Sequence, residues 1–110
     1  MGISKFRAEE LRSLAFGSII AGYTAIGDSY AYPISKIYVV NNTDALLTFS
    51  FQGSTEDHFV LPSLGFLLLD ITLEANNPDY LPVGGSLYVK RNGIPTSGSV
   101  YLTTFYGRNR

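Results

Sequence analysis

The chain has 110 residues, of which 45% are hydrophobic and 15% charged, and its eight Lys/Arg and nine Asp/Glu residues leave a net charge of −1. This length favours one domain of about 100–150 residues, and the high apolar content excludes intrinsic disorder. Duplex nucleic acid is not an expected partner, because its binding needs clustered cations that displace counterions. Soluble domains usually carry about 25% charged residues, so we expect much of this surface to be covered by other molecules.

Cysteine is absent, which excludes disulfides and thiolate metal sites. The longest apolar runs, such as residues 65–69, fall far short of the ~20 residues that span a bilayer. Glu9 and Glu10 precede any apolar stretch, so the first residues are not expected to act as a signal peptide.

The first sixteen residues predict a short helical arm. Ser4 is a suitable N-cap, Leu11 and Leu14 lie three residues apart together with Ala15, and Gly17 is a suitable stop. A helix this short is marginal on its own in water. We therefore expect the arm to pack on its own domain or on a neighbouring molecule.

From residue 17 onward the sequence predicts short strands separated by turns. Residues 45–51 alternate, with Leu47, Phe49 and Phe51 facing inward, and Ile37 and Val39 share one face of the strand at 34–40. Residues 41–44 have the composition of a turn. Further strand-like segments lie at 18–26, 58–61, 66–71, 86–90 and 98–106. About seven or eight short strands without intervening helices predict a mainly β fold, an antiparallel β-sandwich.

The expected domain organisation has three parts. A helical arm at 1–16 precedes a β-sandwich domain at 17–107, and a basic tail follows at 108–110.

The sequence offers little catalytic chemistry. His58 is the only histidine and follows Glu56 and Asp57, but a zinc site would need further His or Cys ligands. No Gly-x-Ser-x-Gly motif accompanies it for a nucleophile triad. We expect no enzymatic activity, and we interpret His58 as a polar residue at the start of a strand.

Four residues with oxygen-donor side chains lie close together in one predicted loop, namely Glu74, Asn76, Asn77 and Asp79. Their spacing is not that of a calcium-binding EF-hand loop, and Pro78 fits a turn better. We expect no metal and no other cofactor.

The fifteen aromatic residues comprise eight Tyr and seven Phe, and the tyrosines are too many for one small core. Phe49, Phe51, Phe66 and Phe105 can fill the interior. Several tyrosines are then expected at the surface, where Tyr is enriched in protein interfaces because it buries a large area and keeps a polar hydroxyl. A carbohydrate-binding face is the alternative, although the chain lacks the Trp that such modules favour for stacking.

Six segments carry a resemblance to a known class of proteins: RAEELRSLAFGS (7–18), TAIG (24–27), VNNTDA (40–45), FSFQG (49–53), HFVLP (58–62) and SVYL (99–102). Taken together, they resemble small virion structural proteins of tailed bacteriophages, which are encoded among the head and tail genes. The resemblance implies a non-enzymatic β-sandwich subunit that works in many symmetric copies within the virion. The implied partners are copies of itself and portal, tail or capsid proteins, without specific nucleic acid or membrane binding.

The leading hypothesis is a neck or tail component at the head–tail interface, where identical subunits close a ring through head-to-tail contacts. The residues expected to make assembly contacts are Phe6, Leu11, Leu14, Tyr38, Tyr88, Tyr101, Arg108 and Arg110. The alternatives are a capsid cement or decoration protein and a carbohydrate- or receptor-binding module at a fibre tip.

Overall fold

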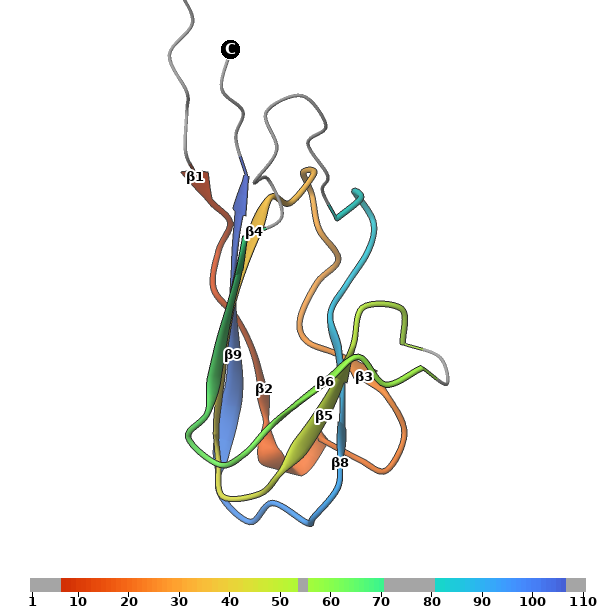
Figure 1. The fold of residues 1–110 in the computed structure, drawn as a ribbon, viewed down its shortest axis with the longest axis vertical. Coiled ribbons are helices and arrows are strands. Elements are labelled where there is room, and N and C mark those ends of the chain that lie inside the picture. Colours follow the sequence, from red (N-terminus) through yellow and green to blue (C-terminus); the bar gives the residue numbers. More distant parts are fainter. Residues whose placement is uncertain (1–6, 54–55, 71–80, 107–110) are drawn as a thin grey trace, which may run out of the picture.

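The structure is a computed structural model that describes residues 7–53, 56–70 and 81–106 (Figure 1). Its strands are β1 (Arg7–Ala8), β2 (Arg12–Ala15), β3 (Thr24–Ala25), β4 (Lys36–Thr43), β5 (Leu47–Ser50), β6 (Phe59–Leu61), β7 (Phe66–Asp70), β8 (Tyr88–Arg91) and β9 (Gly98–Tyr106), and one short 3₁₀ turn, η1, covers Phe16–Ser18. The prediction of a mainly β fold is confirmed. No helix among the described residues is long and apolar enough to cross a membrane.

The strands form two sheets, and every strand pair is antiparallel. Sheet A has five strands in the order β1-β9-β4-β7, with β2 also pairing with β9 beyond the end of β1. Sheet B has four strands in the order β3-β8-β5-β6. Figure 1 shows the two sheets side by side, with sheet A on the left and sheet B on the right.

The core lies between the two sheets. Sheet A contributes Val39 and Leu102, and sheet B contributes Leu47, Phe49 and Val89, all fully buried. The predicted inward positions Leu47 and Phe49 are confirmed, and the face that Ile37 and Val39 share is the buried one, because a strand places alternate side chains on one face.

The expected N-terminal helix is wrong for the part that the structure describes. Arg12–Ala15 pairs with Ser99–Leu102 of β9, so this segment is an edge strand of sheet A. Its side chains alternate, with Arg12 buried and Leu14 partly buried against the core. The sequence pattern did not reveal this strand, because its inward residue at position 12 is an arginine. A charged residue beside leucines at three-residue spacing also fits the polar side of a helix.

Two of the expected interior phenylalanines lie on the outer face instead. Phe66 is 63% exposed, because its pairing with Val40 places it on the side of sheet A opposite to the buried Val39. Phe105 pairs with Lys36 and takes the same outer side. Phe49 fills the core as expected, and Phe51 packs against it while remaining partly exposed.

Asn41 lies inside strand β4 rather than in the predicted turn at 41–44. Its side chain is fully buried, and its Nδ2 donates to the carbonyl oxygens of Ala45 at 2.8 Å and of Leu61 and Pro62 at 3.0 Å each. Its Oδ1 accepts the backbone N–H of Thr43 at 3.0 Å. Burial of this polar side chain is tolerated because its amide is hydrogen-bonded, to the turn after β4 and to the end of β6.

Candidate assembly surface

The outward side chains of β7, β4 and β9 form an apolar surface, which we call the A face and define by Phe66, Leu68, Tyr38, Val40 and Tyr101. The register sets Tyr38 beside Leu68 and sets Val40 between Phe66 and Tyr101. The rings of Tyr38 and Phe66 lie 5.9 Å apart at 52°. Phe66 and Leu68 are 63% and 57% exposed. Exposed apolar patches are typical of interaction surfaces, so the A face is the candidate assembly surface.

The charges beside the A face are paired. Lys36 Nζ lies 3.7 Å from Asp70 Oδ2, across neighbouring positions of β4 and β7. Both side chains remain partly exposed, so the pair contributes little to stability. It does leave that end of the face without net charge, which lowers the cost of covering it.

The structure brings two of the expected contact residues together. Tyr38 and Tyr101 both lie on the A face, on the paired strands β4 and β9. Tyr88 lies on the outer side of sheet B, where Gly53 covers its ring so closely that a Cβ at position 53 would meet the ring at 2.6 Å.

The other expected contacts do not join the A face. Leu11 is exposed at the break between β1 and β2, and Leu14 packs against the core. Phe6, Arg108 and Arg110 lie outside the described residues, as do the candidate calcium ligands Glu74, Asn76, Asn77 and Asp79.

Sequence reasoning missed Phe66 and Leu68 as surface residues. The run of residues 66–69 is entirely apolar, so its alternation does not show which face is inward. Pairing with β4 decides the matter, because Leu67 and Leu69 lie opposite the buried Val39 and Ile37.

A buried ion pair fastens the N-terminal strands to the rest of the fold. Arg12 Nη2 lies 2.6 Å from Glu9 Oε1, and both side chains are less than a tenth exposed. Arg12 also donates from Nη1 to Thr104 Oγ1 at 2.7 Å, from Nε to the Asp28 carbonyl at 2.7 Å and from Nη2 to the Ser29 carbonyl at 3.1 Å. One guanidinium thus connects β2, β9 and the loop at 27–32.

Glu9 completes the same network. Its Oε1 accepts the Thr104 hydroxyl at 2.9 Å, and its Oε2 accepts the backbone N–H groups of Ala31 at 3.0 Å and Tyr32 at 3.1 Å. Both carboxylate oxygens are therefore satisfied within the chain, which indicates a structural role for the pair.

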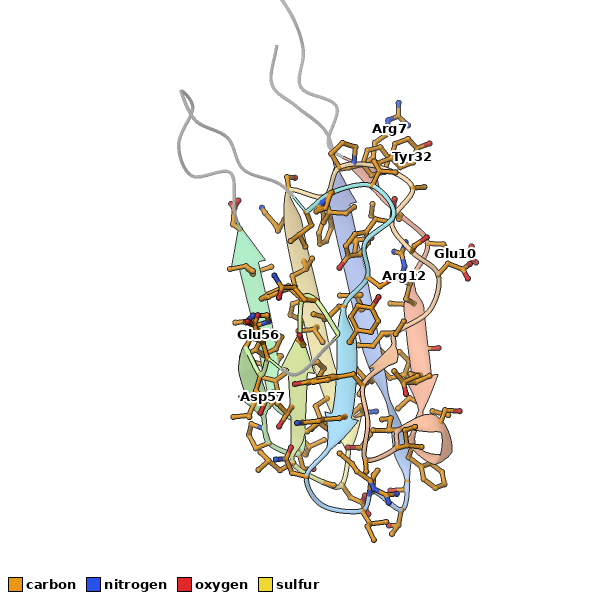
Figure 2. The ribbon with its side chains drawn as sticks, turned by 90° about the vertical axis from the view of Figure 1, so that its right-hand side faces the viewer. Arg7, Glu10, Arg12, Tyr32, Glu56 and Asp57 are labelled. Carbon is orange, nitrogen blue, oxygen red and sulfur yellow. The ribbon has the colours of Figure 1, made fainter. Side chains whose placement is uncertain are left out.

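A pocket of about 630 Å³ opens beside this network. It is lined by residues 8–13, residues 27–29 and 31–32, and Tyr106. The rings of Tyr32 and Tyr106 stack at 4.0 Å and 8°. Figure 2 shows Arg12, Glu10 and Tyr32 together along the β1–β2 side of the molecule. The exposed carboxylates of Glu10 and Asp28 and the exposed ring of Tyr32 are the groups that a ligand could reach.

Tyr30 lies under the same network. The Arg12 guanidinium carbon lies 5.4 Å from the centre of the Tyr30 ring, within the range of a cation–π contact. Burial raises the pKa of Tyr30 well above its usual range. No other described residue bonds its buried hydroxyl, so the ring contributes to stability mainly by packing.

A second charged cluster lies on sheet B around Asp57. The Tyr23 hydroxyl donates to Asp57 Oδ1, and Lys90 Nζ lies 3.0 Å from the same oxygen and 4.9 Å from the centre of the Tyr23 ring. His58 Nδ1 accepts the backbone N–H of Phe51 at 3.0 Å. These contacts hold the segment before β6 against β3 and β8.

This cluster predicts how stability changes at alkaline pH. Desolvation, followed by the hydrogen bond to Asp57 and its negative charge, raises the pKa of Tyr23 from 10.0 to about 12. The folded protein therefore keeps a proton that the unfolded chain releases, and the contribution of Tyr23 to stability is lost as pH rises from about 10 to about 12. The Tyr23→Phe variant has no ionisable hydroxyl at this position, so we expect its stability to fall less than that of wild type over this pH range.

Urea unfolding of both proteins at pH 8, 10 and 11, followed by far-ultraviolet circular dichroism, measures the effect. Tyr38→Phe is the matched control, because this exposed tyrosine lies on the other sheet. If the stability difference between wild type and Tyr23→Phe stays constant with pH, the prediction is wrong.

Within residues 7–53, 56–70 and 81–106, no group of three or more His, Cys, Asp or Glu side chains is placed to hold a metal ion. Comparison with known proteins finds no matching family model and no significant match among curated proteins.

Proposed function

We propose that this chain is a non-enzymatic β-sandwich subunit of a tailed-phage virion, assembling in multiple symmetric copies at the head–tail interface. The observation that carries an assembly role is the A face, where Phe66, Leu68 and Tyr38 present apolar and aromatic surface to solvent. Leaving such a patch uncovered costs free energy in water, and covering it with a neighbouring subunit recovers that free energy. The proposed place of this subunit in the virion rests on the resemblance to small phage structural proteins.

The low charge of the chain supports the same proposal. Only 15% of the residues are charged, and the network of Glu9 and Arg12 turns two of those charges inward. A subunit whose broad face lies against neighbours needs fewer solvating charges than a free monomer. Its partners are then copies of itself and portal, tail or capsid proteins.

The double variant Tyr38→Ser/Tyr101→Ser is expected to incorporate into particles at least about tenfold less than wild type, because two aromatic anchors of the A face are lost. Incorporation is measured by quantitative mass spectrometry of purified virions. Circular dichroism checks that the variant is folded. Ile94→Ser is the control, because Ile94 is 71% exposed but lies outside both sheets.

Electron microscopy of virions in which this subunit carries a label tests its position in the particle. A ring of label on the portal axis supports the head–tail interface. Label spread over the capsid lattice contradicts that position and favours a cement or decoration protein. Incorporation of the double variant equal to wild type would contradict a role for the A face.

The pocket gives the carbohydrate-binding alternative a specific basis. Its exposed Tyr32 ring is held flat against Tyr106, beside the Glu10 and Asp28 carboxylates. Aromatic surface with a few convergent polar groups is typical of small-ligand sites. Binding on a glycan array that Tyr32→Ala abolishes would favour this function over the assembly role.

A further inference from the structure

Strand β7 forms one edge of sheet A. It pairs with β4 on one side, and among the described residues no strand lies on its other side. Figure 2 shows β7, in pale green, at the end of the sheet opposite to β2.

The hydrogen-bond pattern shows which groups of β7 face this open edge. The Asn41 N–H donates to the Gly65 carbonyl at 2.8 Å, which makes Val40 and Phe66 a pair without mutual hydrogen bonds. Because such pairs alternate along antiparallel strands, Leu67 bonds to β4, whereas the N–H and C=O groups of Phe66 and Leu68 point away from it.

The same two residues also expose their side chains, at 63% for Phe66 and 57% for Leu68. Natural edge strands usually carry lysine, proline or a bulge that blocks pairing with another chain. Phe66–Asp70 contains no proline and no lysine, and it pairs with β4 in unbroken register. This edge is therefore suited to accept another strand.

We propose that β7 pairs with β7 of a second copy of this chain, antiparallel about a two-fold axis at Leu68. In this register the outward N–H and C=O groups of Leu68 meet those of the partner's Leu68, and the two leucine side chains lie side by side on the A face. This proposal rests on the proposed assembly function and names one isologous contact between two copies, separate from the head-to-tail contacts that close a ring.

The charges of the edge fit this register. Asp70 lies opposite Phe66 of the second copy, so the two Asp70 carboxylates stay at opposite ends of the contact. Each Asp70 is accompanied by Lys36 of its own chain at 3.7 Å, so the joined edges carry no net charge there. The register therefore avoids the like-charge contact that would oppose pairing.

The contact is small. A strand of five residues buries much less than the roughly 800 Å² per partner of a standard interface. We therefore expect a concentration-dependent dimer in solution, strengthened in a particle where further contacts act together. The contact leaves Tyr38 and Tyr101 of the A face for other virion proteins.

A charge-swap experiment tests the register, because in a two-fold contact residue 68 faces its own equivalent. Leu68→Lys and Leu68→Glu are each expected to weaken self-association at least about tenfold, since like charges then lie opposite each other. An equimolar mixture of the two variants is expected to regain association through an opposite-charge pair. Sedimentation velocity across a concentration series measures each case.

The matched control is Ile94→Lys with Ile94→Glu, which place the same charges at an exposed position outside the sheets. Wild-type association in either Leu68 variant overturns the proposal. Failure of the mixture to recover also overturns it, because the contact then has another register. A wild-type chain that stays monomeric at every concentration overturns it as well.

Virion microscopy separates this outcome from the proposed function. Label in virions together with a failed charge swap overturns only the β7 contact. A successful charge swap without label in virions overturns only the virion role.

Discussion

Replacing Arg12 with methionine is expected to lower the free energy of unfolding by about 3–5 kcal/mol, because it leaves the Glu9 carboxylate buried without its cation. The side chains of Arg12 and Glu9 are 9% and 7% exposed, so little water reaches them to replace the lost contacts. The same change removes the bonds that hold the Asp28 and Ser29 carbonyls. Urea unfolding at pH 7, followed by circular dichroism, measures the loss.

Two variants separate the cost of an unpaired charge from the loss of side-chain packing. The double variant Glu9→Gln/Arg12→Met removes both charges, so we expect it to be clearly more stable than Arg12→Met alone. Arg7→Met, at an exposed position of β1, is expected to change stability by less than about 0.5 kcal/mol. An Arg12→Met protein as stable as wild type would show that the ion pair does not fasten β2 to the fold.

Gly98→Ala is the second substitution with a large expected effect, and we expect it to cost about 3 kcal/mol or more. Gly98 has a φ of +89°, in the region that glycine favours, and a Cβ there would lie 1.9 Å from the Asn42 carbonyl oxygen. This residue begins β9 opposite Thr43, so the central strand pair of sheet A must shift to admit a methyl group.

Gly22→Ala is the matched control for Gly98→Ala. No atom lies within 4 Å of a Cβ at position 22. We expect its stability to remain within about 1 kcal/mol of wild type. Thermal unfolding of both variants in the same buffer tests the pair, and equal melting temperatures would contradict the close approach at Gly98.

The regular strands could be predicted because their residues alternate with a period of two. Ile37 and Val39 in β4, and Leu47 and Phe49 in β5, point inward as the pattern indicates. The positions predicted to face outward did not all follow the alternation. Thr48 and Ser50 are also buried, and their hydroxyls are satisfied there, because Thr48 bonds to Asn92 and Ser50 accepts the N–H groups of Gln52 and Gly53.

The candidate site was only partly predictable for a similar reason. Tyr38 and Tyr101 were expected at the surface from the excess of aromatic residues, but their position on one face depends on the pairing of β4 with β9. Phe66 was expected in the core, and its pairing with Val40 turns it outward. A shift of one residue in a strand exchanges its two faces, and local sequence does not set that register in an all-apolar run.

Composition and local pattern were enough to establish a mainly β chain with little charge and surplus aromatic residues, because these properties need no knowledge of partners distant in sequence. The tertiary structure was needed to place residues 7–8 and 12–15 in sheet A, to join Arg12 to Thr104 and to expose β7 as an edge. Each of these features depends on contacts between residues far apart in the chain. Burial of Arg12 becomes favourable only when Glu9, Thr104 and two loop carbonyls meet around it.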